Sequence, residues 1–125
     1  MREIEFRIRD RDKWYYGVPL SKIKNDTVAF QSYDGNYYNL FADATTLGQY
    51  TGQEDKNGKK IFDGDLCYYF DSNCDEEDGG LKVVYEYGGY WLKGNGFAIS
   101  FCQINTNTDV EVIGNIHDNL ELLQA

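Results

Sequence analysis

The densest group of oxygen ligands in the sequence lies in the stretch DSNCDEEDGG, residues 71–80. Asp71, Asn73 and Asp75 match the first three ligand positions of a calcium-binding EF-hand loop. The match stops there, because the sixth position lacks glycine and the twelfth is Lys82, where a bidentate glutamate is needed. We therefore interpret this stretch as a solvated loop between two strands and expect it to bind no metal ion.

Four further residues could ligate a soft metal or act as nucleophile and base: Cys67, Cys74, Cys102 and His117. They form none of the closely spaced pairs that zinc sites use, and an odd number of cysteines is a poor basis for disulfides. Cys67 and Cys102 both lie in apolar strand patterns, which are typical of small buried side chains. His117 could serve Cys102 as a general base, so a small Cys/His-dependent enzyme is one hypothesis, although nothing in the sequence brings the two together.

Other catalytic patterns are incomplete. Gly94, Asn95 and Gly96 lack the third glycine of a dinucleotide fingerprint, and no GxxxxGK[ST] loop occurs. The carboxylates of Asp63 and Asp65 have no acid/base environment that the sequence reveals. We expect no catalytic residue, no cofactor and no enzymatic activity.

Four basic residues near the N-terminus, Arg7, Arg9, Arg11 and Lys13, precede the aromatic residues 14–16. Basic side chains beside stacking aromatics are how many proteins hold single-stranded nucleic acid. Here acidic residues are interleaved with them, and the chain has 21 acidic against 12 basic residues and a net charge of −9. This balance opposes binding to phosphates or anionic lipid, so we expect a solvent face of mixed charges and neither a nucleic-acid nor a membrane partner.

The N-terminus enters an alternating pattern without the apolar region and cleavage site of a secretory signal. No run of about 18 apolar residues could span a bilayer. Together with cysteines that suit a reducing compartment, these features predict a cytoplasmic location.

Short alternating segments dominate a chain with 11 tyrosines, 7 phenylalanines and one proline. Ile4, Phe6 and Ile8 alternate with charged residues, so we expect all three to face a core. Residues 66–70 are apolar on both faces, which predicts a central strand. Further strands are expected at residues 14–16, 27–31, 81–87, 90–93, 97–101 and 110–113.

Six residues are expected to shape turns and strand ends: Asn57, Gly58, Gly64, Asp65, Gly114 and Asn115. Asn57-Gly58 is the strongest hairpin signal, because both residues tolerate the positive φ of a type I′ turn. Gly64 is expected to relieve a bend where a strand begins, and Gly114 to let the last strand turn. Gly88-Gly89 is expected to separate two strands of a meander.

This pattern predicts one mainly β (α+β) domain over residues 1–125. The expected fold is a small, partly open β-barrel or a strongly bent antiparallel sheet. One or two short helices are expected, including a C-terminal turn that carries Leu120, Leu122 and Leu123 and is capped by Asp118 or Asn119.

Three segments together resemble the YopX family: REIEFRIRDRDKW near the start, LGQYTGQEDKNGKKIFDGDLCYYF at residues 47–70, and EVIGNIHDNLELL at residues 111–123. The shared positions are turn and strand residues, so they indicate a common fold. The resemblance implies a phage or prophage origin and the bacterial cytoplasm as the working compartment. It carries over no catalytic residue, because none is established for that family.

Our leading hypothesis is a non-enzymatic phage accessory protein that binds another protein or a second copy of itself. Tyrosine adds contact area at low entropic cost, so aromatic strand residues are the candidate surface. These residues are Tyr68, Tyr85, Tyr87, Tyr90 and Trp91. An alternative is that the acidic surface imitates DNA and occupies the basic groove of a host protein.

Overall fold

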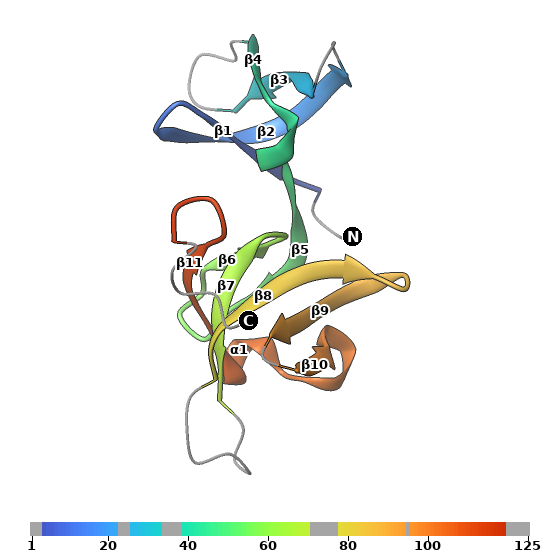
Figure 1. Ribbon diagram of the computed structural model, residues 1–125, viewed down its shortest axis with the longest axis vertical. Coiled ribbons are helices and arrows are strands. Elements are labelled where there is room, and N and C mark those ends of the chain that lie inside the picture. Colours follow the sequence, from blue (N-terminus) through green and yellow to red (C-terminus); the bar gives the residue numbers. More distant parts are fainter. Residues whose placement is uncertain (1–3, 23–25, 34–38, 71–77, 95, 120–125) are drawn as a thin grey trace. The chain divides into compact units, whose positions relative to one another are not determined.

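The computed structural model describes residues 4–22, 26–33, 39–70, 78–94 and 96–119. The chain divides into two compact units, Met1–Tyr50 and Thr51–Ala125 (Figure 1). The expected single domain over residues 1–125 stays a prediction.

The first unit is a row of antiparallel strands in the order β4-β3-β2-β1-β5. Its elements are β1 (Phe6–Asp10), β2 (Lys13–Lys22), β3 (Thr27–Ser32), β4 (Asn39–Asp43), the 3₁₀ helix η1 (Ala44–Thr46) and the start of β5 (Gly48–Glu54). Strands β1 and β4 contact each other although two strands lie between them in the row. The sheet is therefore strongly bent.

The inside of this bend holds the first core. Ile8, Val28, Phe30 and Ala42 form a buried cluster, in which Ile8 and Phe30 are fully buried. Ile4 was expected to face the core as well, but it is 65% exposed because the paired strand begins only at Phe6.

The second unit contains a five-stranded sheet in the order β10-β9-β8-β7-β11. The rest of β5 continues into this unit and pairs with β6. The elements are β6 (Lys60–Phe62), β7 (Asp65–Tyr69), β8 (Asp78–Glu86), β9 (Gly89–Gly94), β10 (Phe97–Ser100), the 3₁₀ helix η2 (Phe101–Gln103), α1 (Thr106–Asp109) and β11 (Val110–Asn115).

Strand β7 lies between β8 and β11, which confirms the expected central strand. Its successive residues Leu66 and Cys67 are both fully buried, as a strand covered on both faces requires. Cys67 joins Leu81, Val83 and Leu92 in the second core. The buried position expected for Cys67 is thus confirmed.

The expected fold class is confirmed as mainly β, with bent antiparallel sheets and short helices. The described residues form no closed barrel, and α1 was not anticipated. The expected helical turn at Leu120–Leu123 and most of the acidic stretch, residues 71–77, lie outside the described residues. Within the described ranges, no helix is long and apolar enough to cross a membrane.

Candidate functional site

The β8–β9 hairpin carries four of the five aromatic residues expected at an interaction surface. Its strands pair as far as Glu86 opposite Gly89, which leaves Tyr87 and Gly88 as a two-residue turn. Their φ angles are 52° and 79°, and two successive positive values are the mark of a type I′ turn. The turn therefore lies one residue earlier than the expected Gly88-Gly89, and the ribbon runs out to one side of its unit (Figure 1).

Tyr87 is an unusual residue for this turn. The left-handed backbone region costs an L-residue roughly 1–2 kcal/mol, which is why glycine and asparagine dominate such positions. The Tyr87 side chain is 94% exposed, so core burial does not offset this cost. Its ring stands edge-on to that of Trp91, with centroids 6.4 Å apart, and contacts of this kind contribute roughly 0.5–1.5 kcal/mol, which offsets part of the backbone cost.

Tyr85 and Tyr90 lie opposite each other on the two strands. Their rings meet edge to face, with centroids 5.0 Å apart. Tyr90 is 8% exposed and packs against Phe101, so it is a core residue, whereas Tyr85 is 58% exposed. The buried ring thus supports an exposed one.

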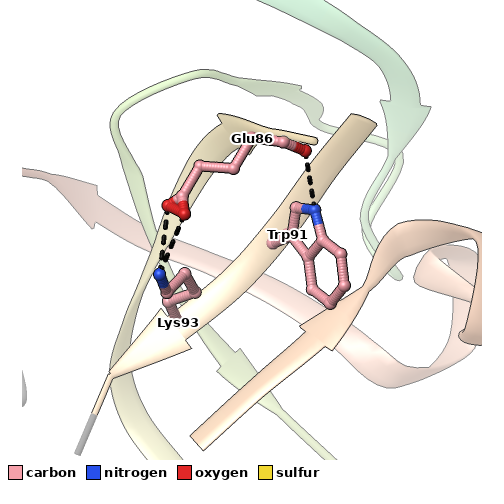
Figure 2. A network of polar contacts seen from close by, with 3 residues as sticks. All are labelled: Glu86, Trp91 and Lys93. Carbon is pink, nitrogen blue, oxygen red and sulfur yellow. Dashed lines mark hydrogen bonds and ion pairs between the residues drawn. The ribbon is translucent and has the colours of Figure 1, made fainter. Parts of the chain in front are cut away.

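Trp91 on β9 is held by a hydrogen bond to the neighbouring strand β8. Its indole Nε1 donates a hydrogen bond of 2.9 Å to the backbone carbonyl of Glu86 (Figure 2). Both carboxylate oxygens of Glu86 in turn accept hydrogen bonds of 3.0 Å from Lys93 Nζ. Because this ion pair is partly exposed, it adds little stability.

Neighbouring residues on a strand point to opposite faces, so Trp91 lies on the face opposite to Tyr85 and Tyr90. The two faces meet at the turn. We call Tyr85, Tyr87 and Trp91 the aromatic tip. It presents one side chain from each face and one from the turn between them.

Tyr68 belongs to a different cluster. It lies on β7, opposite Glu111 of β11, and its ring contacts Phe70 with centroids 6.1 Å apart. Lys56 Nζ lies 4.3 Å from the centroid of Phe70 and 3.9 Å from the carboxylate of Glu111. This part of β7 neighbours the start of β8, whereas the aromatic tip lies at the end of β8. The structure therefore groups three of the five predicted residues and places Tyr68 elsewhere.

The hairpin at residues 55–59 differs from the expected type I′ turn. Gly58 has a φ of 79°, but Asn57 is not among the residues with positive φ. The Gly58 N–H donates to the carbonyl of Asp55 at 3.0 Å, and the Asp55 N–H donates to the carbonyl of Lys59 at 2.8 Å. These bonds define a three-residue loop, in which a type I turn is followed by one left-handed glycine.

The reason for this geometry is Asp55, which sequence reasoning did not single out. Its Oδ1 accepts hydrogen bonds from the backbone N–H groups of Asn57 and Lys59, each at 2.9 Å. An aspartate two residues before Asn-Gly is the available sequence signal, because its side chain can bond the backbone two residues on.

Gly64 has a φ of 91° between β6 and β7, where its N–H donates to the Val83 carbonyl and its carbonyl accepts from Ile116. The Asp65 side chain is 1% exposed, and its Oδ2 accepts a hydrogen bond of 2.8 Å from the Phe62 N–H. Both residues thus hold backbone segments together.

Asn115 organises the end of β11. Its Oδ1 accepts hydrogen bonds from the backbone N–H groups of His117 and Asp118, both at 2.9 Å. At the preceding residue, Gly114, a Cβ atom would lie 2.5 Å from Asn119 Oδ1. The chain can make this close turn because Gly114 has no side chain.

The candidate nucleophile and base occupy different surroundings. Cys102 lies in η2 and is exposed, contrary to the buried position expected for it, because the strand ends at Ser100 and the chain turns there. Its Sγ lies 3.1 Å from Ser100 Oγ. His117 follows β11 and lies 4.0 Å from the Cβ position of Gly64. Among the described residues, no group of three metal-binding side chains occurs.

The N-terminal basic residues are only in part the mixed solvent face that was expected. Arg9 pairs with Asp12 at 3.7 Å, as such a face predicts. Arg7, however, is 6% exposed, and its guanidinium lies over the Trp14 ring, 4.6 Å from the centroid. The charge pattern alone could not reveal that this arginine packs on an aromatic ring.

Two comparisons relate the chain to known proteins. A family model described as YopX protein matches residues 5–124. The crystal structure of protein EF1440 from Enterococcus faecalis is similar, with 24% identity, a TM-score of 0.68 and coverage of 99% of this chain and 100% of that one. At this identity the likeness shows the fold. The comparison with curated proteins gives no match.

Proposed function

This chain belongs to the YopX family, and we propose that it is a non-enzymatic protein-binding module whose docking element is the aromatic tip. The partner is another protein or a second copy of the chain. Tyrosine and tryptophan are enriched among the few residues that dominate the binding energy of protein interfaces.

The observation that carries this proposal is the position of Tyr87. A left-handed backbone and 94% exposure both work against tyrosine as a choice for stability. Residues in unfavourable backbone conformations cluster at functional sites, so such a residue supports a functional hypothesis. A binding role accounts for a large aromatic group held in solvent at the end of a rigid turn.

The surroundings of the tip support the same role. Tyr85 rests on the buried ring of Tyr90, and Trp91 is tied to the Glu86 carbonyl. Side chains that are already ordered lose less entropy when a partner binds. The tip is thus suited to binding without rearrangement.

The positions of Cys102 and His117 give no support to a Cys/His-dependent enzyme. The neighbour of the exposed Cys102 thiol is the Ser100 hydroxyl, and His117 lies beside Gly64.

The family resemblance favours a phage or prophage accessory role in the bacterial cytoplasm. The net charge of −9 favours one second candidate, a DNA-mimicking inhibitor of a host nucleic-acid-binding protein.

The wild type and Tyr87→Asn are compared in two experiments. Affinity capture from bacterial lysate detects binding to a host protein, and light scattering detects self-association. The wild type should retain a host protein or self-associate, and the variant should do so at least about tenfold more weakly, as loss of one central aromatic side chain predicts. Equal binding by the two proteins would reject the aromatic tip. Competition of the captured protein by duplex DNA would favour the DNA-mimic candidate instead.

A further inference from the structure

The Asn57-Gly58 bond allows a covalent rearrangement that no enzyme needs to catalyse. The backbone nitrogen of Gly58 can attack the side-chain Cγ of Asn57. A bond from N to Cγ forms, the Gly58 N–H proton passes through water to Nδ2, and the bond from Cγ to Nδ2 breaks. Ammonia departs and residue 57 becomes a cyclic succinimide. Water then opens the ring at either carbonyl, giving aspartate or isoaspartate. Glycine favours this attack because it has no Cβ to hinder it.

Both residues are exposed in the hairpin, so water reaches them freely. The attacking atom, however, is restrained. The Gly58 N–H donates to the Asp55 carbonyl at 3.0 Å, while the Asp55 carboxylate holds the N–H groups of Asn57 and Lys59 at 2.9 Å. Attack requires the Gly58 nitrogen to lose its proton and turn toward the Asn57 side chain, which these bonds oppose.

We propose that Asn57 is a latent isoaspartate site and that Asp55 protects it for as long as the hairpin stays closed. An isoaspartate inserts one extra carbon into the backbone between residues 57 and 58. The N–H groups of Asn57 and Lys59 then no longer reach the same carboxylate oxygen. Modification therefore removes the turn geometry on which the hydrogen bonds of Asp55 depend. Hydrolysis of the succinimide does not restore asparagine, so the change is irreversible.

The rate of deamidation at residue 57 tests the protection. We compare the folded full-length chain with the same chain in denaturing urea, using peptide mass spectrometry that separates aspartate from isoaspartate. The folded chain should react at least about tenfold more slowly, the factor that a local opening free energy of about 1.4 kcal/mol produces. Equal rates in the two states would overturn the proposal.

Asp55→Asn tests the role of Asp55, and a series of sub-denaturing urea concentrations on the wild type serves if that variant fails to fold. A folded Asp55→Asn chain should deamidate at residue 57 several-fold faster, and the wild-type rate should rise with urea before global unfolding. An unchanged rate in either experiment would overturn the role of Asp55.

Asn57→Asp is the matched control for the product, since it adds the same charge to an unaltered backbone. This variant should unfold at nearly the wild-type urea midpoint, whereas the purified isoaspartyl protein should unfold at a clearly lower one. Coinciding midpoints would refute the claimed loss of the turn.

Discussion

The carboxylate of Asp55 accepts a hydrogen bond of 2.9 Å from the backbone N–H of Val112, 57 residues further along the chain. Its other oxygen holds the hairpin turn through Asn57 and Lys59. The neighbouring Lys56 N–H donates to the Val110 carbonyl at 2.9 Å. One side chain, 3% exposed, thus joins the hairpin to the last strand of the sheet.

Asp55→Ala should lower the free energy of unfolding by about 4–5 kcal/mol, because three backbone donors lose a charged acceptor and each such bond contributes roughly 1.5 kcal/mol or more. Urea denaturation measures this loss. The matched control is Glu54→Ala, an exposed acidic neighbour that should change stability by less than about 0.5 kcal/mol. Similar midpoints for the two variants would contradict the role given to Asp55.

The hairpin turn predicts unequal effects at adjacent residues. Gly58→Ala should cost about 1 kcal/mol, because residue 58 has a φ of 79°. Asn57→Ala should have a much smaller effect, since its side chain is exposed and its φ is not positive. If thermal denaturation shows a larger loss of stability for Asn57→Ala than for Gly58→Ala, the hairpin has the type I′ turn expected from the sequence.

Gly114→Ala should destabilise the protein by about 1 kcal/mol. The new Cβ would displace Asn119, whose Oδ1 accepts a hydrogen bond from the Asn115 N–H. Gly89→Ala is the control, because a Cβ there meets nothing within 4 Å and φ is not positive. The two melting temperatures should differ, and a shared value would disprove the close approach at Gly114.

The purified protein should show no appreciable affinity for single- or double-stranded DNA at physiological salt. Its net charge of −9 sets up a repulsive field, and the Arg7 guanidinium is buried over Trp14. Gel-shift titration checks this expectation. Micromolar binding that weakens steeply with salt and is lost in Arg9→Ala would promote the basic strand to a binding site.

Much of the fold was predictable from local pattern. Strands were expected at residues 27–31, 66–70 and 97–101, and the structure has β3, β7 and β10 there, with bounds that differ by one residue at some ends. The residues 106–109 gave no such signal, because four polar residues in one helical turn have no apolar stripe to detect.

The contacts that define the site were harder to predict. The bond from Asp55 to Val112 depends on where β11 passes, which no local sequence signal encodes. The left-handed backbone of Tyr87 follows from the register that places Tyr85 opposite Tyr90, because that register makes Tyr87 and Gly88 the two turn residues in place of Gly88 and Gly89. Tertiary packing decided both features.

The central claim is that Tyr87 is retained for binding, and the retention of a host protein or a second copy by Tyr87→Asn tests it most directly. Asparagine suits the left-handed turn, so this variant should unfold at or above the wild-type midpoint, with a gain of about 0.5 kcal/mol after the Trp91 contact is lost. Arg11→Asn is the matched control, because Arg11 also has a positive φ, 61°, in a two-residue hairpin turn. We predict that both variants are at least as stable as the wild type and that only Tyr87→Asn loses binding. Binding that survives Tyr87→Asn, or is lost equally in Arg11→Asn, would contradict the account.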